Sequence, residues 1–227
     1  MKSESSIISF VQNFPVSASL KTADTGQYVV NNAHNSRQFG IENPRDIKGL
    51  TIKDIRFRAT EWGKLYAKSI AEHDFLVHEN QTSVTLRNRF LDDSGDAQME
   101  EMTKLPIMGT RGNVLGITTF RRDITSTLPP ISVYQLNRNF YRATDAIERT
   151  MIFFGIKEYF ILAPSETQFR VFLLKAERLT NKEISRALRI SDRTVECHCV
   201  AIRNKVAEGS FATALSATNR RTEYSAN

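Results

Sequence analysis

Residues 162–206 read LAPSETQFRVFLLKAERLTNKEISRALRISDRTVECHCVAIRNKV, and this segment predicts three short helices in succession. Ser165 and Thr180 each precede a glutamine or glutamate by three residues, which is the spacing of a capping box at a helix start. Ser191 is positioned to cap the third helix, along which apolar residues recur at steps of four, three and four. The spacing therefore predicts helices that each bury one face.

The last two of these helices are separated by the tight turn Arg189-Ile190-Ser191, which is typical of a helix-turn-helix. In such a unit the second helix enters the major groove of DNA. A plain three-helix bundle with a solvated outer face has the same periodicity and remains an open alternative. Because successive helical residues are ~100° apart, the face opposite the apolar residues is the expected reading surface. That face consists of Arg193, Glu196, Cys197, Val200, Arg203 and Asn204.

Three pieces of this segment resemble, in order and without gaps, the LuxR-type (FixJ/NarL-like) DNA-binding domain. They are TNKEIS at residues 180–185, ISDRTVECH at residues 190–198 and IRNKV at residues 202–206. The resemblance implies an all-α helix-turn-helix domain over residues 156–219, with its fourth helix within residues 209–219.

The sequence departs from the family pattern at Arg178 and Arg189, which stand where the family usually has turn glycines. If these positions require a positive φ, each arginine costs on the order of 1 kcal/mol relative to glycine. These two residues and the groove-facing Glu196 leave open an alternative. In it the chain is an interaction adaptor whose specific DNA binding is weak or lost.

The candidate DNA contacts combine cations, capping hydroxyls and outward-facing side chains. The lysines and arginines are expected to contact phosphates, as are the free backbone N–H groups at the helix start near Ser191. Glu196 could accept from a cytosine amino group, and Val200 could contact a thymine methyl. The full candidate set is Thr180, Lys182, Arg186, Ser191, Arg193, Thr194, Glu196, Cys197, Val200, Arg203, Asn204 and Lys205.

The first half of the chain alternates between extended and helical patterns. Strands are predicted at residues 14–24, 27–32, 83–91, 100–108 and 114–120. Helices are predicted at residues 35–40, 44–55 and 60–78. Hairpins at both ends of this order indicate an α+β domain with a five-stranded antiparallel sheet and helices on one face.

This half resembles a PAS sensor domain, assigned to residues 12–126. The resemblance implies a small-molecule pocket or a protein-docking face between the sheet and the helices. His73 lies on the helix where PAS haem sensors place their iron ligand, so haem is an alternative cofactor; otherwise the cofactor is unknown. The matching pieces are FPVSASLK (14–21), DTGQY (24–28), RQFG (37–40), KGLTIKDI (48–55), KLPI (104–107), NVLGI (113–117) and RDIT (122–125).

Residues 127–155 are predicted to form a linker helix between the two domains. Apolar residues recur at steps of three or four over residues 131–151, so one amphipathic helix is expected. Leu136 and Ile147 lie on its apolar face. This face could pair with a second copy across a dimer or dock onto the PAS sheet of its own chain.

Composition indicates a globular protein that contacts nucleic acid. The 227-residue chain has a net charge of +6, and residues 156–227 contribute most of it, with 12 Lys/Arg against 8 Asp/Glu. No apolar run approaches the roughly 18 residues of a membrane span, and no secretion signal is readable. Cys197 and Cys199 diverge on one helix, which argues against a disulfide or a metal site and for a reducing, cytoplasmic setting.

These patterns together predict a cytoplasmic transcriptional regulator with no recognisable enzyme motif. It is expected to bind double-stranded promoter DNA as a homodimer, to contact RNA polymerase, and to bind a small molecule or a protein at the PAS domain. A haem- or redox-sensing regulator, with oxidation of the outward Cys197 blocking DNA binding, is the remaining alternative.

Overall fold

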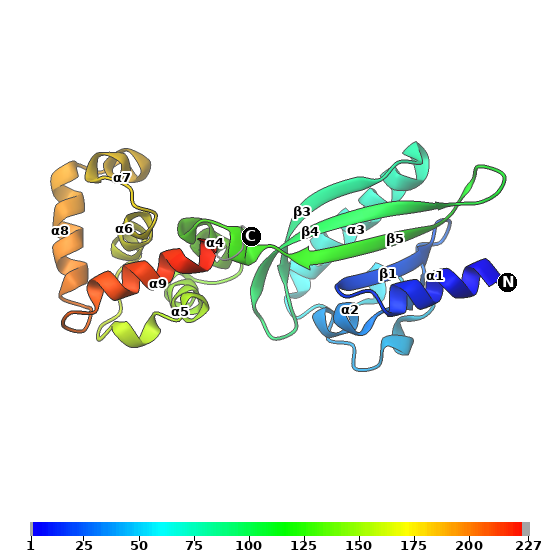
Figure 1. Ribbon diagram of the computed structural model, residues 1–227, viewed down its shortest axis with the longest axis horizontal. Coiled ribbons are helices and arrows are strands. Elements are labelled where there is room, and N and C mark those ends of the chain that lie inside the picture. Colours follow the sequence, from blue (N-terminus) through cyan, green and yellow to red (C-terminus); the bar gives the residue numbers. More distant parts are fainter. Residues whose placement is uncertain (1, 224–227) are drawn as a thin grey trace. The chain divides into compact units, whose positions relative to one another are not determined.

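The computed structural model describes residues 2–223 and divides the chain into two compact units, with the boundary between Ile124 and Thr125. Each unit has its own core and is described by itself (Figure 1). Among the described residues, no helix combines the length and the apolar character that a bilayer span requires.

The N-terminal unit is built on a five-stranded antiparallel sheet in the order β2-β1-β5-β4-β3. The predicted α+β class with a five-stranded antiparallel sheet is confirmed. The strands are β1 (Ser17–Thr22), β2 (Tyr28–Asn31), β3 (Val84–Leu91), β4 (Ala97–Met108) and β5 (Val114–Asp123). Between β2 and β3 the chain forms α2 (Ala33–Gln38), η1 (Pro44–Ile47), η2 (Ile52–Asp54) and α3 (Thr60–Asn80).

An aromatic core fills the space between α3 and one face of the sheet, which we call the inner face. The Phe57 ring lies 5.5 Å from the rings of both Trp62 and Tyr66, and Phe90 of β3 lies 5.3 Å from Tyr66. Figure 1 shows α3 behind the strands, and the buried Ile70 and Met102 join this cluster from α3 and β4. These residues bury one face of α3 against the sheet.

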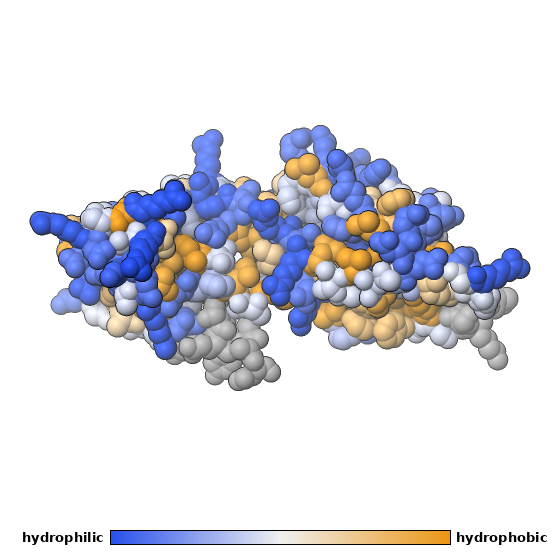
Figure 2. All heavy atoms as spheres, turned by 90° about the horizontal axis from the view of Figure 1, so that it is seen from above, coloured by the Kyte–Doolittle hydropathy of each residue, from blue (hydrophilic) through white to orange (hydrophobic). Residues whose placement is uncertain are grey.

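A further helix, α1 (Lys2–Gln12), packs on the opposite face of the sheet. Val11 is fully buried, and the Phe14 ring that follows α1 lies 4.4 Å from Phe120 of β5. The expectation that helices occupy one face only is therefore wrong, because α1 covers the outward side chains of β1 and β2. Phe10 remains 54% exposed, and Figure 2 shows apolar surface on the N-terminal unit.

The C-terminal unit is a helical bundle with one continuous core. The rings of Phe169 and Phe172, which lie on the third helix of this unit, are stacked with their centroids 6.2 Å apart. Both rings are fully buried. The helices are α4 (Pro130–Arg138), α5 (Ala143–Phe154), α6 (Glu166–Ala176), α7 (Asn181–Leu188), α8 (Asp192–Arg203) and α9 (Phe211–Glu223), with short turns η3 (Thr125–Thr127) and η4 (Lys157–Tyr159).

The predicted linker helix over residues 127–155 is instead two helices, α4 and α5. Asn139 ends the first one, because its side-chain Nδ2 donates to the carbonyls of Gln135 (2.7 Å) and Leu136 (3.4 Å) in the last turn. Both helices belong to the core of the C-terminal unit. Leu136 is 2% exposed and Ile147 is 7% exposed, so the predicted dimer seam is already buried within one chain.

Candidate functional site

Each helix of the predicted DNA-binding segment begins at the cap that the sequence indicates. Ser165 Oγ accepts from the Gln168 backbone N–H, and the Gln168 side chain accepts in return from the Ser165 N–H at 2.9 Å. Thr180 forms the same reciprocal pair at the start of α7. Ser191 Oγ accepts from the backbone N–H of Thr194 at 3.1 Å. These local bonds fix where α6, α7 and α8 start.

The two turn arginines adopt the left-handed backbone that glycine usually supplies. Arg178 has φ 65° and Arg189 has φ 56°, and Arg189 is the C-cap of α7. Its backbone N–H bonds to the Arg186 carbonyl, which closes the last turn of α7. The turn between α7 and α8 is therefore retained despite the departure from the family pattern.

Arg189→Gly is expected to raise the free energy of unfolding of the C-terminal unit by about 1 kcal/mol, because it removes a left-handed non-glycine residue. Arg186→Gly is the matched control within the same helix, where glycine costs about 1 kcal/mol. Urea unfolding of both variants measures the two effects. Equal destabilisation by both substitutions would contradict the prediction.

The α8 helix presents the outward face that the sequence predicts. Val195 and Ile202 are buried at 0% and 1% exposure and Cys199 is half-buried, whereas Val200 on the opposite side is 56% exposed. The expected reading surface is thus directed to solvent. Its exposed residues are Arg193, Glu196, Cys197, Val200, Arg203 and Asn204.

The remaining DNA-contact candidates differ in how free their side chains are. Lys182 and Arg186 are exposed on α7, and Ser191 is exposed at the start of α8. Two others are partly engaged within the protein. Thr194 is half-buried with its hydroxyl 2.8 Å from Ser191 Oγ, and the Lys205 ammonium donates to the carbonyl of Ala163 at 2.8 Å.

The exposed Thr180 uses its hydroxyl in the capping box of α7, where it donates to Glu183 at 2.7 Å. Arg203 places its guanidinium carbon 5.3 Å from the centre of the Phe211 ring of α9, which orients this outward side chain. The contacts of the whole set with DNA remain predictions.

A buried ion cluster lies between α3 and the inner face of the sheet in the N-terminal unit. Lys21 of β1 and Lys104 of β4 both pair with the carboxylate of Asp74 on α3, at 2.7 Å for Lys21. The side chains of the two lysines are 2% and 0% exposed, and that of Asp74 is 12% exposed. Burial lowers the pKa of Lys104 to about 7, although the nearby Asp74 carboxylate opposes this change.

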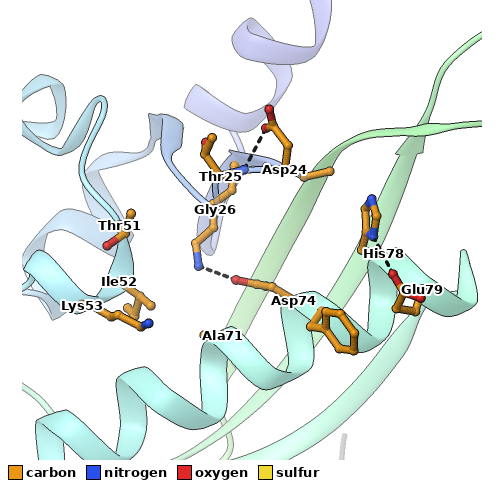
Figure 3. Close-up of a pocket in the computed structure, with 13 residues that line it drawn as sticks. Asp24, Thr25, Gly26, Thr51, Ile52, Lys53, Ala71, Asp74, His78 and Glu79 are labelled. Atoms are coloured by element: carbon orange, nitrogen blue, oxygen red, sulfur yellow. Dashed lines mark hydrogen bonds and ion pairs between the residues drawn. The ribbon is translucent and has the colours of Figure 1, made fainter.

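A cavity of about 420 Å³ opens onto this cluster, between the β1–β2 turn, η2 and α3. Lys21 and Asp74 line it together with Lys53, His78 and other residues. Figure 3 shows Asp74 directed from α3 into the cavity, with a dashed line marking its ion pair with Lys21. The volume is in the range of small-molecule sites in proteins.

A second set of buried polar groups lies farther along the inner face. Tyr66 of α3 donates to Glu100 of β4 at 2.7 Å, and Arg121 of β5 donates to Asn35 of α2 at 2.6 Å. Burial raises the pKa of Glu100, while Arg121 and Tyr66 oppose the change. The Arg121 guanidinium also stacks 4.6 Å from the centre of the Phe39 ring. The inner face of the sheet thus carries buried polar side chains next to the aromatic core.

His73, the haem-ligand candidate, is half-buried on α3 with Nδ1 3.4 Å from Ser69 Oγ. It is not among the residues that line the cavity described above. Within residues 2–223, no three His, Cys, Asp or Glu side chains gather in a way that could hold a metal ion. Cys197 is exposed and Cys199 half-buried, and both are free thiols.

Sequence reasoning missed the inner-face charges. A signal was present, because three basic residues occupy inward positions of the strands, namely Lys21, Lys104 and Arg121. Charges at buried strand positions are rare unless they are paired. Asp74, the partner of Lys21 and Lys104, lies on a helix 53 residues after Lys21, and only the fold brings these three residues together.

Comparison with known proteins identifies the C-terminal domain. Residues 165–214 match the family described as bacterial regulatory proteins, luxR family. No curated protein sequence matches the chain. The resemblance to solved structures is at the level of the fold, because sequence identities are low.

Two solved structures resemble the chain over nearly its full length. One is a VqmA–ligand–DNA complex from Vibrio cholera, with 20% identity and a TM-score of 0.58 over 97% of this chain and 88% of that chain. The other is a phage VqmA–DPO complex, with 21% identity and a TM-score of 0.54 over 98% and 89% of the two chains. The PAS domain of Bordetella pertussis BvgS matches with 14% identity, a TM-score of 0.47, and coverage of 61% and 97%.

The N-terminal sheet and helices form the predicted PAS fold, and the C-terminal bundle contains the predicted helix-turn-helix. On one chain, therefore, a PAS-fold unit precedes a DNA-binding domain of the luxR family of bacterial regulatory proteins.

Proposed function

We propose that this protein is a transcriptional regulator that binds promoter DNA as a dimer and responds to a small molecule held in its PAS-fold unit. The observation that carries the proposal is the solvent-directed face of α8 inside a luxR-family domain. The cavity over Lys21 and Asp74 supports the sensing role. We place the protein in the cytoplasm, where promoter DNA and RNA polymerase are accessible.

The α7–α8 pair supplies both kinds of contact that DNA recognition needs. Lys182 and Arg186 on α7 and Arg193 near the start of α8 are exposed cations for phosphates. The exposed Glu196 and Val200 lie on the outward face of α8, where they can meet base edges in the major groove. Phosphate contacts supply affinity and register, whereas the α8 side chains supply sequence preference.

Of the fold relatives, the Vibrio VqmA complex contains a ligand and DNA, the phage VqmA complex contains DPO, and another VqmA structure is a dimer. Dimeric binding places two α8 helices on two half-sites of an operator. A ligand changes this binding only if it has different affinities for two states of the protein. The regulatory input is therefore expected to be a state change of the N-terminal unit upon ligand binding.

A salt titration of DNA affinity tests the DNA-binding role. The full-length protein is expected to lose affinity steeply as salt rises and to keep a preference for its own promoter over unrelated DNA. Arg193→Ala should weaken binding and reduce the salt slope by about 1, the amount for one phosphate contact. Arg142→Ala is the control, because it removes an exposed positive charge at the start of α5.

Fluorescence anisotropy with labelled promoter fragments measures both quantities. Glu196→Ala should instead change the preferred sequence while leaving the salt slope unchanged, since this side chain is assigned to bases. Flat, weak binding to every DNA would overturn the proposal and favour the adaptor alternative.

A further inference from the structure

The ion cluster on the inner face contains one positive charge more than its paired carboxylate can neutralise. Lys21 and Lys104 both contact Asp74, and the side chains of both lysines are at most 2% exposed. One carboxylate balances one ammonium, so the second is left without a counter-ion in a region with little water. An uncompensated buried charge is costly, and it is normally neutralised by deprotonation or by an ion of opposite charge.

The other charged groups around Lys104 do not remove this imbalance. Arg121 on β5 adds a cation. Glu100 on β4 accepts a hydrogen bond from Tyr66, and its charged form is stabilised more by Arg121 than by Lys104. His73 on α3 also faces Lys104. Burial and the charge of Lys104 both lower the pKa of the His73 imidazole, so this side chain adds no positive charge. With every lysine, arginine and carboxylate in this interior ionised, cations exceed anions by one.

Two hydroxyl groups beside Lys104 add unused hydrogen-bonding capacity. Ser19 of β1 and Thr119 of β5 are directly opposite each other, and Thr119 is also opposite Lys104 of β4. Both hydroxyl oxygens are buried without a hydrogen-bond partner. These hydroxyls make the interior around Lys104 polar, although neither of them lines the cavity.

The cavity gives a ligand direct access to Lys21. It is lined by Lys21 and Asp74, and it is bounded by Ala71 and Phe75 of α3 and Ile52 of η2, which offer apolar contact. Asp24 and Glu79 are at its mouth, but both are exposed to water, which screens their charges. The buried charge at the inner wall is therefore the stronger determinant of what binds.

We propose that this cavity binds a small monocarboxylate whose negative charge pairs with Lys21, while Asp74 remains paired with Lys104. The carboxylate supplies the missing counter-charge, and its apolar portion contacts the α3 and η2 side chains. This inference names the ligand class of the sensing unit and rests on the proposed function only for its regulatory meaning.

Binding of the anion is coupled to proton uptake. Lys104 has a pKa lowered to about 7 by burial, so it is partly neutral near that pH before the ligand binds. An added negative charge nearby favours the protonated lysine. Affinity is therefore greatest from about pH 5 to pH 7, where the ligand carboxylate is ionised and Lys104 is protonated. Above pH 7 it falls by up to about tenfold per pH unit, the limit for one coupled proton.

Thermal unfolding of the full-length protein with acetate, propionate and benzoate tests the inference, with acetamide, propionamide and benzamide as uncharged matched probes. At concentrations well above Kd, at least one acid should raise the Tm of the N-terminal unit by about 4 °C or more. Its amide should shift the Tm by less than about 1 °C. Sodium chloride at equal ionic strength controls for general salt effects.

Lys21→Met should weaken binding of that acid about tenfold or more while the unit stays folded, because Asp74 and Lys104 then form a balanced pair. Lys64→Met is the matched control, since it removes a lysine whose side chain is 69% exposed on the same unit. Calorimetry in two buffers with different ionisation enthalpies should show proton uptake at pH 8.

The inference is overturned if no acid stabilises the protein more than its amide does, or if Lys21→Met binds the acid as well as the unaltered protein does. Promoter binding measured on the same samples separates this failure from failure of the proposed function. Specific DNA binding without carboxylate binding refutes only the ligand class. Carboxylate binding without DNA binding refutes only the regulatory role.

Discussion

Asp74→Asn should lower the free energy of unfolding of the N-terminal unit by about 3–5 kcal/mol at neutral pH, the usual cost of leaving a buried charge without its partner. The substitution keeps the shape of the side chain but leaves the ammonium groups of Lys21 and Lys104 without their common anion. Burial alone would raise the pKa of Asp74, yet the two lysines hold it below its ordinary value. This carboxylate is therefore the ionised partner throughout the neutral range.

The same variant should recover stability as the pH rises. Lysine side chains in the unfolded chain keep their protons up to a pKa of about 10.4. The pKa of folded Lys104 is about 7 even beside Asp74, and removal of that carboxylate lowers it further. Between these values the unfolded state binds more protons than the folded state, so stability rises with pH.

Urea unfolding at pH 6, 7, 8 and 9 measures this trend, and Glu72→Gln is the control because Glu72 is exposed on the same helix. An Asp74→Asn variant as stable as the control would show that the cluster does not hold the unit together.

Val133→Asp should unfold the C-terminal unit, with a loss of about 3–5 kcal/mol, because it buries an unpaired charge in the core of that unit. Val133 is 1% exposed on α4 and belongs to the core cluster, whereas Gln135 on the same helix is exposed. Gln135→Asp is therefore the matched control and should cost less than about 0.5 kcal/mol. Circular dichroism during urea unfolding measures both variants.

This pair of variants separates two roles for α4. If the apolar face of α4 were a seam between two copies, Val133→Asp would give a folded monomer with an intact helix-turn-helix. If it is part of the core, as the structure places it, the variant loses helical signal and DNA binding together. A folded, monomeric variant would contradict the structural assignment.

The helix-turn-helix could be predicted almost residue by residue, because its signals are local. Ser165, Thr180 and Ser191 each bond to a backbone group three residues away, so the sequence spacing alone locates the helix starts. The outward face of α8 follows from helical periodicity in the same way. Even the positive φ of Arg189 could be anticipated, since the family pattern marks that position as a turn.

The features that escaped prediction depend on tertiary contacts. The α4–α5 break is made by the Asn139 side chain, and an apolar repeat continues through it undisturbed. The α1 helix is stabilised by burial of Val11 against strands that follow it in the chain. The ion cluster joins Lys21, Asp74 and Lys104 from three separate elements, and no sequence spacing reports their proximity.

The pairing of β1 with β5 has a consequence for how the protein is made. Ser17 lies opposite Arg121, so the central strands of the sheet come from the two ends of the N-terminal unit. During synthesis about a hundred further residues are added after β1 before its partner β5 leaves the ribosome. Contacts between residues so distant in sequence form slowly. Truncations that stop before β5 leave the edges of β1 and β4 unpaired and prone to aggregate. A fragment intended for expression therefore has to extend beyond Asp123.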